Sequence, residues 1–320
     1  MILSTIFLEN TTQRMNKSVT ILLSTYNGEK YLEEQLASIF SQTYWQNCTL
    51  FVRDDGSKDG TVAILKKYEQ EGKLRLECGE NVGFVRSFFW LINNAPEADY
   101  YSFADQDDVW NADKIERAVK MLENAASEAP QKPLLYFANL DIYDSEMHFV
   151  RHNDFISSMP SFETLCTQSL LTGMTFIFNK QLLNLIRTVN PLNVDGHDYI
   201  TAMIASGCGK LVMDSEPVAK YRRHNSNTSP LNVSFFKMFM WRFKRFFIKG
   251  NNKISSQFYE YREKFEPLLS EDKRYFVHLL TKDKTLHFRN LRLCFYPKRF
   301  RKSSIFEEVA LRLMFLTGRL

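Results

Sequence analysis

The sequence of 320 residues contains no apolar run of about 18 residues, the length that a membrane-spanning helix requires. Its five cysteines are scattered without any CxxC spacing, so no structural zinc site is predicted. Their odd number and wide spacing are typical of reduced, buried thiols in a cytosolic protein. The apolar start, Met1–Leu8, is short, has no basic residue before it and leads into polar residues, so no secretory signal is expected.

Two phosphate-binding patterns are also missing. The sequence has no GxxxxGK[ST] loop, which argues against a P-loop enzyme. It has no glycine-rich, basic loop near the N-terminus, and this disfavours a nucleotidyltransferase. Hydrophobic residues make up 44% and charged residues 24%, a globular mix that excludes a disordered or collagen-like chain. The length suffices for a catalytic domain of about 200–250 residues and an appendage.

Charge is unevenly distributed along the chain. The formal net charge is only +4, but the residues from Phe235 onward hold 20 Lys and Arg against 8 Asp and Glu. The residues before Phe235 hold 21 basic against 29 acidic side chains. Such asymmetry predicts an acidic catalytic part and a basic part that meets anions.

Short apolar segments alternate with segments of helical spacing in the first half of the chain. The predicted strands are Val19–Leu23, Thr49–Arg53, Leu74–Glu77, Tyr100–Ala104 and Leu134–Leu140. Helices are expected between them, including Gly83–Asn93 and Ala112–Ala126. This alternation favours an α/β fold in which helices cover a parallel sheet.

The second half is less regular. A strand at Met174–Phe178, a helix over His197–Ser206 and a strand at Lys210–Met213 are predicted there. The last part of the chain has a helical and basic pattern. The predicted organisation is an N-terminal extension (1–17), a catalytic domain (18–232) and a helical C-terminal region (233–320).

Three polar clusters follow predicted strands: Ser24–Asn27, Asp54–Ser57 and Asp105–Asp108. Ligands of α/β proteins bind at the carboxyl ends of the strands, so these clusters are expected to line one site. Mg²⁺ and Mn²⁺ prefer carboxylate oxygens and commonly bridge to substrate phosphates, which makes the third cluster a candidate cation site. A carboxylate of the second cluster is placed to accept hydrogen bonds from a base or ribose. The alternatives are a helix cap at Asp107 or Asp108, and an ordinary Asx turn in the second cluster.

Seven segments in register resemble a known family. STYNGEKYL, VRDDGSKDGT, NVGFVRSF and ADQDDVW resemble, in this order, the family 2 glycosyltransferases of the GT-A fold. LTGMTFIFN, GHDY and YRRHNSNTS resemble the bacterial rhamnosyltransferase-like branch of that family. The resemblance extends from Val19 to Ser229 and implies a Rossmann-like, mostly parallel sheet flanked by helices.

The resemblance also implies a reaction. An inverting, metal-dependent transfer of a sugar is expected, with dTDP-L-rhamnose as the donor and a UDP-sugar as the alternative donor. The expected acceptor is a saccharide or a lipid-linked saccharide, in the synthesis of a bacterial cell-surface polysaccharide.

Individual residues receive roles from the same resemblance. It implies that the nucleotide-sugar is bound by Thr25, Tyr26, Glu29, Asp54, Asp55, Asn81, Gly83, Arg86 and Asp105. Asp55 is the preferred contact for the base. Asp107 would bind Mg²⁺ or Mn²⁺, and His224 would complete the metal shell or touch the diphosphate. Gln106 stands where many members have a small residue, and Asp108 is expected to cap the following helix.

An inverting transfer needs a general base that removes the proton from the acceptor hydroxyl as this hydroxyl attacks the anomeric carbon. The resemblance places Asp198, in the segment GHDY, in this role. The alternative is that its carboxylate only favours the first turn of a helix. Asp195 is the nearby competitor. Gly173 is expected to shape the acceptor side of the pocket or to form a simple turn.

The segment Ser234–Lys253 combines Phe and Trp with Lys and Arg, and Arg289–Lys302 adds more cations. Such side chains suit an interface with anionic lipid headgroups, so a cytoplasmic protein attached to the inner face of the cell membrane is predicted. Packing on the catalytic domain and a dimer interface are the alternatives, which leaves a homo-oligomer open. Nucleic-acid binding is not expected, because no nucleic-acid motif accompanies the charge. A non-catalytic, membrane-docked scaffold is the competing function, although it would be expected to have lost carboxylates such as Asp105, Asp107 and Asp198.

Overall fold

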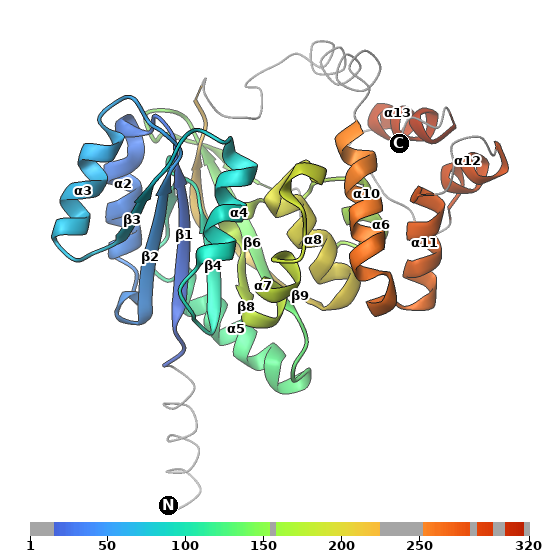
Figure 1. The fold of residues 1–320 in the computed structure, drawn as a ribbon, viewed down its shortest axis with the longest axis horizontal. Coiled ribbons are helices and arrows are strands. Elements are labelled where there is room, and N and C mark those ends of the chain that lie inside the picture. Colours follow the sequence, from blue (N-terminus) through green and yellow to red (C-terminus); the bar gives the residue numbers. More distant parts are fainter. Residues whose placement is uncertain (1–15, 154–157, 225–251, 282–286, 297–304, 317–320) are drawn as a thin grey trace, which may run out of the picture.

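The computed structural model describes residues 16–153, 158–224, 252–281, 287–296 and 305–316. These residues form a nine-stranded sheet with helices on both faces, and a group of C-terminal helices lies beside the sheet (Figure 1). Within the described ranges, no helix is both long enough and apolar enough to cross a membrane.

The sheet is mixed. Its strands are β1 (Val19–Thr25), β2 (Cys48–Asp54), β3 (Arg75–Cys78), β4 (Tyr100–Ala104), β5 (Val109–Trp110), β6 (Leu134–Tyr143), β7 (Phe149–His152), β8 (Ile177–Asn179) and β9 (Lys210–Arg222). Their order is β3-β2-β1-β4-β8-β6-β9-β5, and β7 pairs with β6. The strands β1 to β4 are parallel, and so are β6 and β9. Since β8 is antiparallel to both β4 and β6, the expected parallel arrangement holds best for the half that contains β1 to β4.

The sequence of β1 is apolar because both faces of the sheet are covered. Leu22 packs into one core cluster, whereas Ile21 and Leu23 pack into the other. Successive side chains of a strand point to opposite faces, so one apolar run contributes to two cores. The helices on the Ile21 face are α2 (Glu29–Phe40), α3 (Thr61–Gln70) and α5 (Lys114–Glu128). Those on the Leu22 face are α4 (Phe84–Asn94), α6 (Phe162–Thr167), α7 (Lys180–Ile186) and α8 (His197–Cys208).

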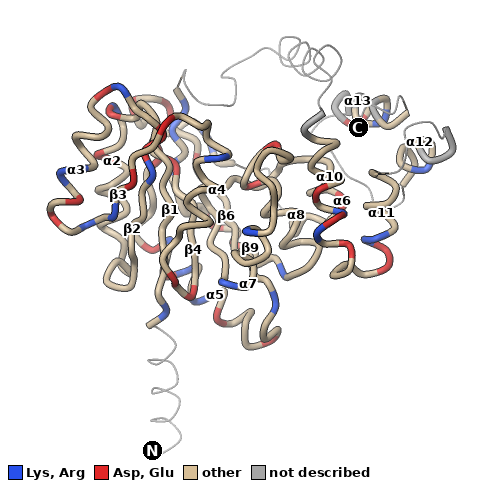
Figure 2. The backbone as a smooth tube through the Cα atoms, viewed as in Figure 1, with Lys and Arg blue, Asp and Glu red and all other residues tan. Residues whose placement is uncertain are grey.

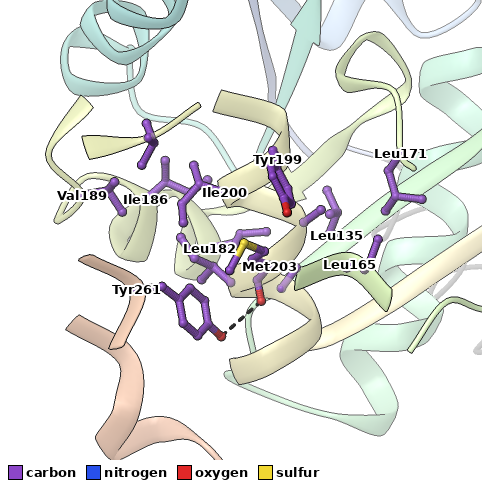
Figure 3. Packing of buried hydrophobic residues seen from close by; sticks show 14 of the residues in the cluster. Leu135, Leu165, Leu171, Leu182, Ile186, Val189, Tyr199, Ile200, Met203 and Tyr261 are labelled. Carbon is purple, nitrogen blue, oxygen red and sulfur yellow. Dashed lines mark hydrogen bonds between the residues drawn. The ribbon is translucent and has the colours of Figure 1, made fainter. Parts of the chain in front are cut away.

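The C-terminal helices pack into the core on the Leu22 face of the sheet. They are α10 (Asn252–Phe265), α11 (Glu271–Thr281), α12 (His287–Cys294) and α13 (Ile305–Leu316). Phe258 and Tyr261 of α10 belong to the same cluster as Ile200 and Met203 of α8. Figure 3 shows Tyr261 beside Met203, whose carbonyl accepts a hydrogen bond from the tyrosine hydroxyl at 3.2 Å. Thus α10 packs directly on α8, while the residues 234–251 of the predicted lipid-binding segment lie outside the described ranges.

Some elements differ from their predicted bounds for identifiable reasons. The predicted strand Met174–Phe178 begins as a 3₁₀ turn, Gly173–Thr175, and only Ile177 onward pairs as β8. The strand β9 continues to Arg222 because a bulge absorbs its polar middle, where the register with β6 shifts. Cys166 and Cys294 are buried, as predicted for the thiols, but Cys48 and Cys208 are only partly buried and Cys78 is exposed.

Candidate active site

Asp54 joins the carboxyl ends of β1 and β2. The two strands pair in register, so Thr25 lies opposite Asp54, and the Thr25 hydroxyl donates to Asp54 Oδ1 at 2.9 Å. The hydroxyl of Ser57 also donates to Oδ1, at 2.6 Å, and the N–H groups of Gly56 and Ser57 donate to Oδ2 at 3.1 and 2.8 Å. Asp54 is buried and accepts four hydrogen bonds, which is the full capacity of a carboxylate. It therefore shapes the turn after β2, as the Asx-turn alternative anticipated.

Asp55 is the second buried carboxylate of this turn. It forms an ion pair with Arg53 and accepts hydrogen bonds from the N–H groups of Val82 and Gly83, both at 2.9 Å. Gly83 directly precedes α4 and has a φ of 87°, a conformation that favours glycine. The carboxylate thus fixes the start of α4 against β2. Three protein donors leave one acceptor position on this carboxylate, whereas Asp54 has none left; the contact of Asp55 with the base stays a prediction.

Other predicted nucleotide-sugar residues lie around this turn. Asn81 and Arg86 are exposed near the start of α4. Glu29 lies in the first turn of α2, where its carboxylate accepts a hydrogen bond from the N–H of Gly60 and so ties α2 to the start of α3. The binding roles of these three residues stay predictions.

Gln106 bridges the loops after β4 and β1. Its Oε1 accepts a hydrogen bond from the N–H of Tyr26 at 2.8 Å, and its Nε2 donates to the carbonyl of Tyr26 at 3.1 Å. A Cβ atom added at Gly28 would lie 2.3 Å from Gln106 Oε1, so the amide occupies the space that a side chain at residue 28 would need. The Tyr26 ring remains 45% exposed, free to meet a ligand. Sequence reasoning noted Gln106 only as a departure from the family pattern and missed this bridge.

Asp107 meets the end of β9. Its Oδ2 lies 2.8 Å from His224 Nε2, although the two residues are 117 positions apart. Arg222 supports this junction, because its Nε donates to the carbonyl of Asp107 at 3.0 Å and its backbone N–H donates to Asp108 Oδ1 at 3.0 Å. The His224 ring lies 4.8 Å from the ring of Tyr31. The structure therefore brings together the two predicted metal ligands, whereas residues 225–229 of the same segment lie outside the described ranges.

Asp105 is the carboxylate that directly follows β4. Burial, together with the charges of Asp107 and Asp198, raises its pKa to about 7, and the positive charge of Lys114 opposes the shift. The contribution of Asp198 shows that the proposed base lies within electrostatic reach of the acidic cluster. Figure 2 shows acidic and basic segments close together above β1, where these loops meet.

Lys114 is a buried cation behind the cluster. Its Nζ donates to the carbonyl of Met174 at 2.6 Å and lies 3.0 Å from the centre of the Trp110 ring. Burial holds its pKa well below the usual value, against the attraction of Asp108 and Asp105. The helix α5 begins at Lys114, so the expectation that Asp108 caps it is wrong: Asp108 accepts from Arg222 instead. The sequence pattern did not indicate that Lys114 is buried, because a single lysine in a helical pattern is normally exposed.

Asp198 lies in the first turn of α8, next to the turn that contains Gly173. A Cβ atom at residue 173 would lie 2.9 Å from Asp198 Cβ, so only glycine allows this close approach. The N–H of Tyr199 donates to Asp198 Oδ1 at 2.8 Å. Both the predicted helical-turn role and the predicted placement near the pocket are therefore compatible with the geometry.

His197, beside Asp198, is a buried histidine. Its ring stacks on Phe88 at 3.8 Å with an angle of 13°. Burial lowers its pKa to about 4, and the charge of Asp198 opposes the shift. The imidazole is therefore neutral at pH 7, and it fixes the start of α8 against α4.

Residues 20–184, more than half of the chain, match the model of glycosyl transferase family 2. This chain belongs to that family. The match runs from β1 into α7 and includes the clusters that follow β1, β2 and β4. The prediction that the chain is a glycosyltransferase is confirmed.

Two relatives show how far this family 2 glycosyltransferase resembles individual proteins. It is 27% identical over 224 residues to the dTDP-rhamnosyl transferase RfbG of Shigella flexneri, which covers 67% of this chain and 75% of that protein. It is 26% identical over 216 residues to an uncharacterized glycosyltransferase of Rickettsia typhi, which covers 66% of this chain and 65% of that protein.

Solved structures show the fold of the glycosyltransferase. S. aureus TarS 1–349 matches with a TM-score of 0.58 at 15% identity, covering 93% of this chain and 81% of that one. The mannosyltransferase PcManGT from Pyrobaculum calidifontis, in complex with GDP-Man and Mn²⁺, matches with a TM-score of 0.53 at 17% identity, covering 95% and 84%. These likenesses confirm the predicted GT-A architecture.

The end of β9 offers this glycosyltransferase two donor groups for a divalent cation. In the part of the chain that the structure describes, no cluster of three or more His, Cys, Asp or Glu side chains could hold a metal ion. Asp107 and His224 supply one carboxylate and one imidazole, both of which Mn²⁺ accepts. Cations of this kind often have only one or two protein ligands and complete their coordination with phosphate oxygens and water. The pair fits a cation that is shared with a substrate.

Proposed function

We propose that the protein transfers a sugar, with inversion, from a nucleotide-diphosphate donor to a saccharide hydroxyl, and that it requires Mg²⁺ or Mn²⁺. The observation that carries the proposal is the contact of Asp107 with His224, 2.8 Å apart, which joins the loop after β4 to the end of β9. Asp105 lies in the same loop as Asp107, and Asp198, at the start of α8, is near enough for its charge to raise the pKa of Asp105.

Asp198 acts as the general base. Its carboxylate lies at the start of α8, beside the Gly173 turn, and removes the proton from the acceptor hydroxyl as that oxygen attacks the anomeric carbon. Asp105, which directly follows β4, contacts the donor.

The donor side holds the nucleotide and its diphosphate. Asp107 and His224 would hold a divalent cation, which would neutralise the charge that develops on the leaving diphosphate. The exposed Tyr26 ring and Asp55 lie at the two neighbouring strand ends and bind the nucleoside. Arg86, exposed near the start of α4, suits the negative charge of the phosphates.

The donor proposed is dTDP-L-rhamnose. RfbG, named as a dTDP-rhamnosyl transferase, supports this choice at 27% identity. A UDP-sugar is the second candidate, because TarS has been solved in complex with UDP-GlcNAc and its fold matches this chain with a TM-score of 0.57. The acceptor is a saccharide or lipid-linked saccharide of a bacterial surface polysaccharide, reached by the protein from the cytoplasmic face of the membrane.

A thermal-shift screen tests the donor. A ligand that binds only the native state stabilises it by about 2.7 kcal/mol at 100 times its Kd, so a bound donor raises the Tm measurably. We expect the largest shift with dTDP-L-rhamnose and Mn²⁺, compared with UDP-GlcNAc and GDP-mannose at equal concentrations. A larger shift with UDP-GlcNAc would make a UDP-sugar the donor in place of dTDP-L-rhamnose. No shift with any of the three would contradict the proposal.

Replacing Asp107 with Ala tests the cation. Removing a group that stabilises charge in the transition state costs about 10²- to 10³-fold in kcat, and we expect a loss of this size in the release of nucleotide from the donor. The Mn²⁺-dependent part of the thermal shift should disappear as well. Asp113→Ala is the matched control, since Asp113 is half exposed and lies 3.7 Å from Arg117 on the surface of α5. Undiminished, metal-dependent turnover in Asp107→Ala would contradict the assignment.

A further inference from the structure

The loop that leads to Asp198 is held by a C-terminal helix. The side chain of Gln257 in α10 accepts a hydrogen bond from the N–H of Asp195 at 2.9 Å. Glu260, one helical turn further, accepts from the N–H of Asn190 at 2.9 Å and from the side-chain amide of Asn193 at 2.7 Å. Three hydrogen bonds thus join α10 to the six residues before Gly196.

Gln257 and Glu260 are unusual for a surface helix because both are buried, at 0% and 5% exposure. In the described part of the chain Glu260 forms no ion pair, and its carboxylate is satisfied by neutral amide donors. Burying a carboxylate without a cation costs free energy unless hydrogen bonds compensate, so the burial of Glu260 depends on its contacts with the loop.

The opposite end of α8 is held by the same group of helices. The hydroxyl of Tyr261 donates to the carbonyl of Met203 at 3.2 Å (Figure 3). Lys273 of α11 donates to the carbonyls of Ser206 and Gly207 at 2.8 and 3.1 Å, where a cation also suits the negative end of the helix. The C-terminal helices therefore contact both the loop before α8 and the second half of α8 itself.

We propose that Gln257 and Glu260 are positioning residues that set the place of Asp198, so that the C-terminal helices are part of the acceptor half of the active site. The inference rests on the proposed function, in which Asp198 is the base. Gly196 is extended and has no side chain to cap α8, so the loop before it, together with the stack of His197 on Phe88, sets where the first turn lies. A misplacement of about 1 Å at a reacting group costs about 10²-fold in rate, so a small loop shift is sufficient to slow the reaction.

The test removes the hydrogen bonds and leaves the rest of the full-length chain intact. Gln257→Leu removes the acceptor for Asp195, and Glu260→Leu removes both acceptors for the loop. Glu260→Gln keeps an acceptor for Asn190 and serves as the conservative variant. Thr281→Val is the matched control: Thr281 is equally buried and accepts a hydrogen bond from Arg262 of α10 at 3.2 Å, but it lies away from the loop.

Two measurements are made on each variant. The first is the rate of nucleotide release from dTDP-L-rhamnose, and in parallel from UDP-GlcNAc, with Mn²⁺ and with water as the acceptor, because water also needs the base. The second is amide hydrogen exchange of residues 190–198, which reports on the loop without any substrate. The Tm of each variant separates positioning from a general loss of stability.

We expect kcat to fall at least tenfold in Gln257→Leu and Glu260→Leu, with the KM for the donor within twofold of the wild type. Exchange of residues 190–198 should rise at least tenfold in the same variants, and Glu260→Gln should recover most of both. Thr281→Val should keep kcat within twofold even if its Tm falls equally. A kcat within twofold of the wild type in both leucine variants would overturn the proposal, as would a loss that Thr281→Val shares.

Asp198→Asn separates this proposal from the function on which it rests. If Asp198→Asn releases nucleotide at the wild-type rate, the assignment of the base is wrong and the positioning proposal falls with it. If Asp198→Asn is slow, Gln257→Leu should cause no further loss in that background. A further tenfold loss there would show that Gln257 acts through another group, and this would overturn the positioning proposal alone.

Discussion

The donor half and the acceptor half of the pocket are built in different ways. On the donor side, the loops that follow β1, β2 and β4 bond to one another through Thr25–Asp54 and Gln106–Tyr26, whereas the contact of Asp107 with His224 comes from a distant strand end. On the acceptor side, Asp198 stands on a helix whose approach is bonded to α10, about 60 residues further along the chain. The proposed site therefore extends beyond the family-matched region, since the loop before Asp198 is bonded to a C-terminal helix.

The largest effect is expected when the acceptor half loses its base. Asp198→Asn should lower transfer by about 10²- to 10⁴-fold, the usual contribution of a general base, while donor affinity stays unchanged because the donor half is intact. Single-turnover nucleotide release and donor-induced thermal shifts measure the two quantities. Asp195→Asn, the same change three residues earlier, is the control. Normal transfer by Asp198→Asn would show that the acceptor half does not supply the general base through Asp198.

A nearly equal effect, on stability, is expected in the donor half. Arg53 and Asp55 form an ion pair with side chains only 6% and 3% exposed, so Arg53→Met leaves a buried carboxylate without its cation. The free energy of unfolding should fall by about 3–5 kcal/mol, as measured by urea denaturation. Lys180→Met is the control, since it breaks an exposed pair with Glu97 and should cost less than about 1 kcal/mol. Equal losses in the two variants would show that the donor half is not held by its buried charges.

The smallest effect concerns pH and the start of α8. Burial lowers the pKa of His197 to about 4, below the value of about 6.5 for an unperturbed histidine, so the folded state resists protonation. Its contribution to stability is therefore complete above pH 6.5 and is lost as the pH falls from 6.5 toward 4. Between pH 7 and pH 5 the loss should be about 2 kcal/mol.

His197→Phe tests this contribution, because a phenyl ring can keep the stack on Phe88 and cannot be protonated. The difference in unfolding free energy between pH 7 and pH 5 should be about 2 kcal/mol smaller in the variant than in the wild type. The same variant should leave the donor-induced thermal shift unchanged at pH 7. An identical pH profile for the two proteins would mean that His197 is protonated as easily in the folded chain as in the unfolded one.

Local patterns predicted the strands of the donor half and the edge at which its polar clusters meet. The strand Tyr100–Ala104 has its predicted bounds, and the clusters at Asp54 and Asp105 meet at one edge because alternating strands and helices make parallel neighbours. The acceptor half depends on contacts between distant residues. Gln257 and Glu260 lie in a helix with many polar residues, where a sequence pattern indicates exposure, but the loop at 190–195 and α8 cover them. On the donor side, too, no spacing indicates that His224 would meet Asp107, 117 residues away; only the resemblance to the family named both as metal ligands.

The contact between Gly28 and Gln106 has a consequence for how such a site can change over time. A side chain at residue 28 and a long side chain at residue 106 compete for one volume, because an added Cβ would lie 2.3 Å from the Gln106 amide. Replacing Gly28 alone would force Gln106 away from the Tyr26 backbone, whereas a small residue at 106 makes the larger residue at 28 harmless. The two positions are therefore expected to covary among homologues, and a defect caused at one of them should be suppressed by a second substitution at the other.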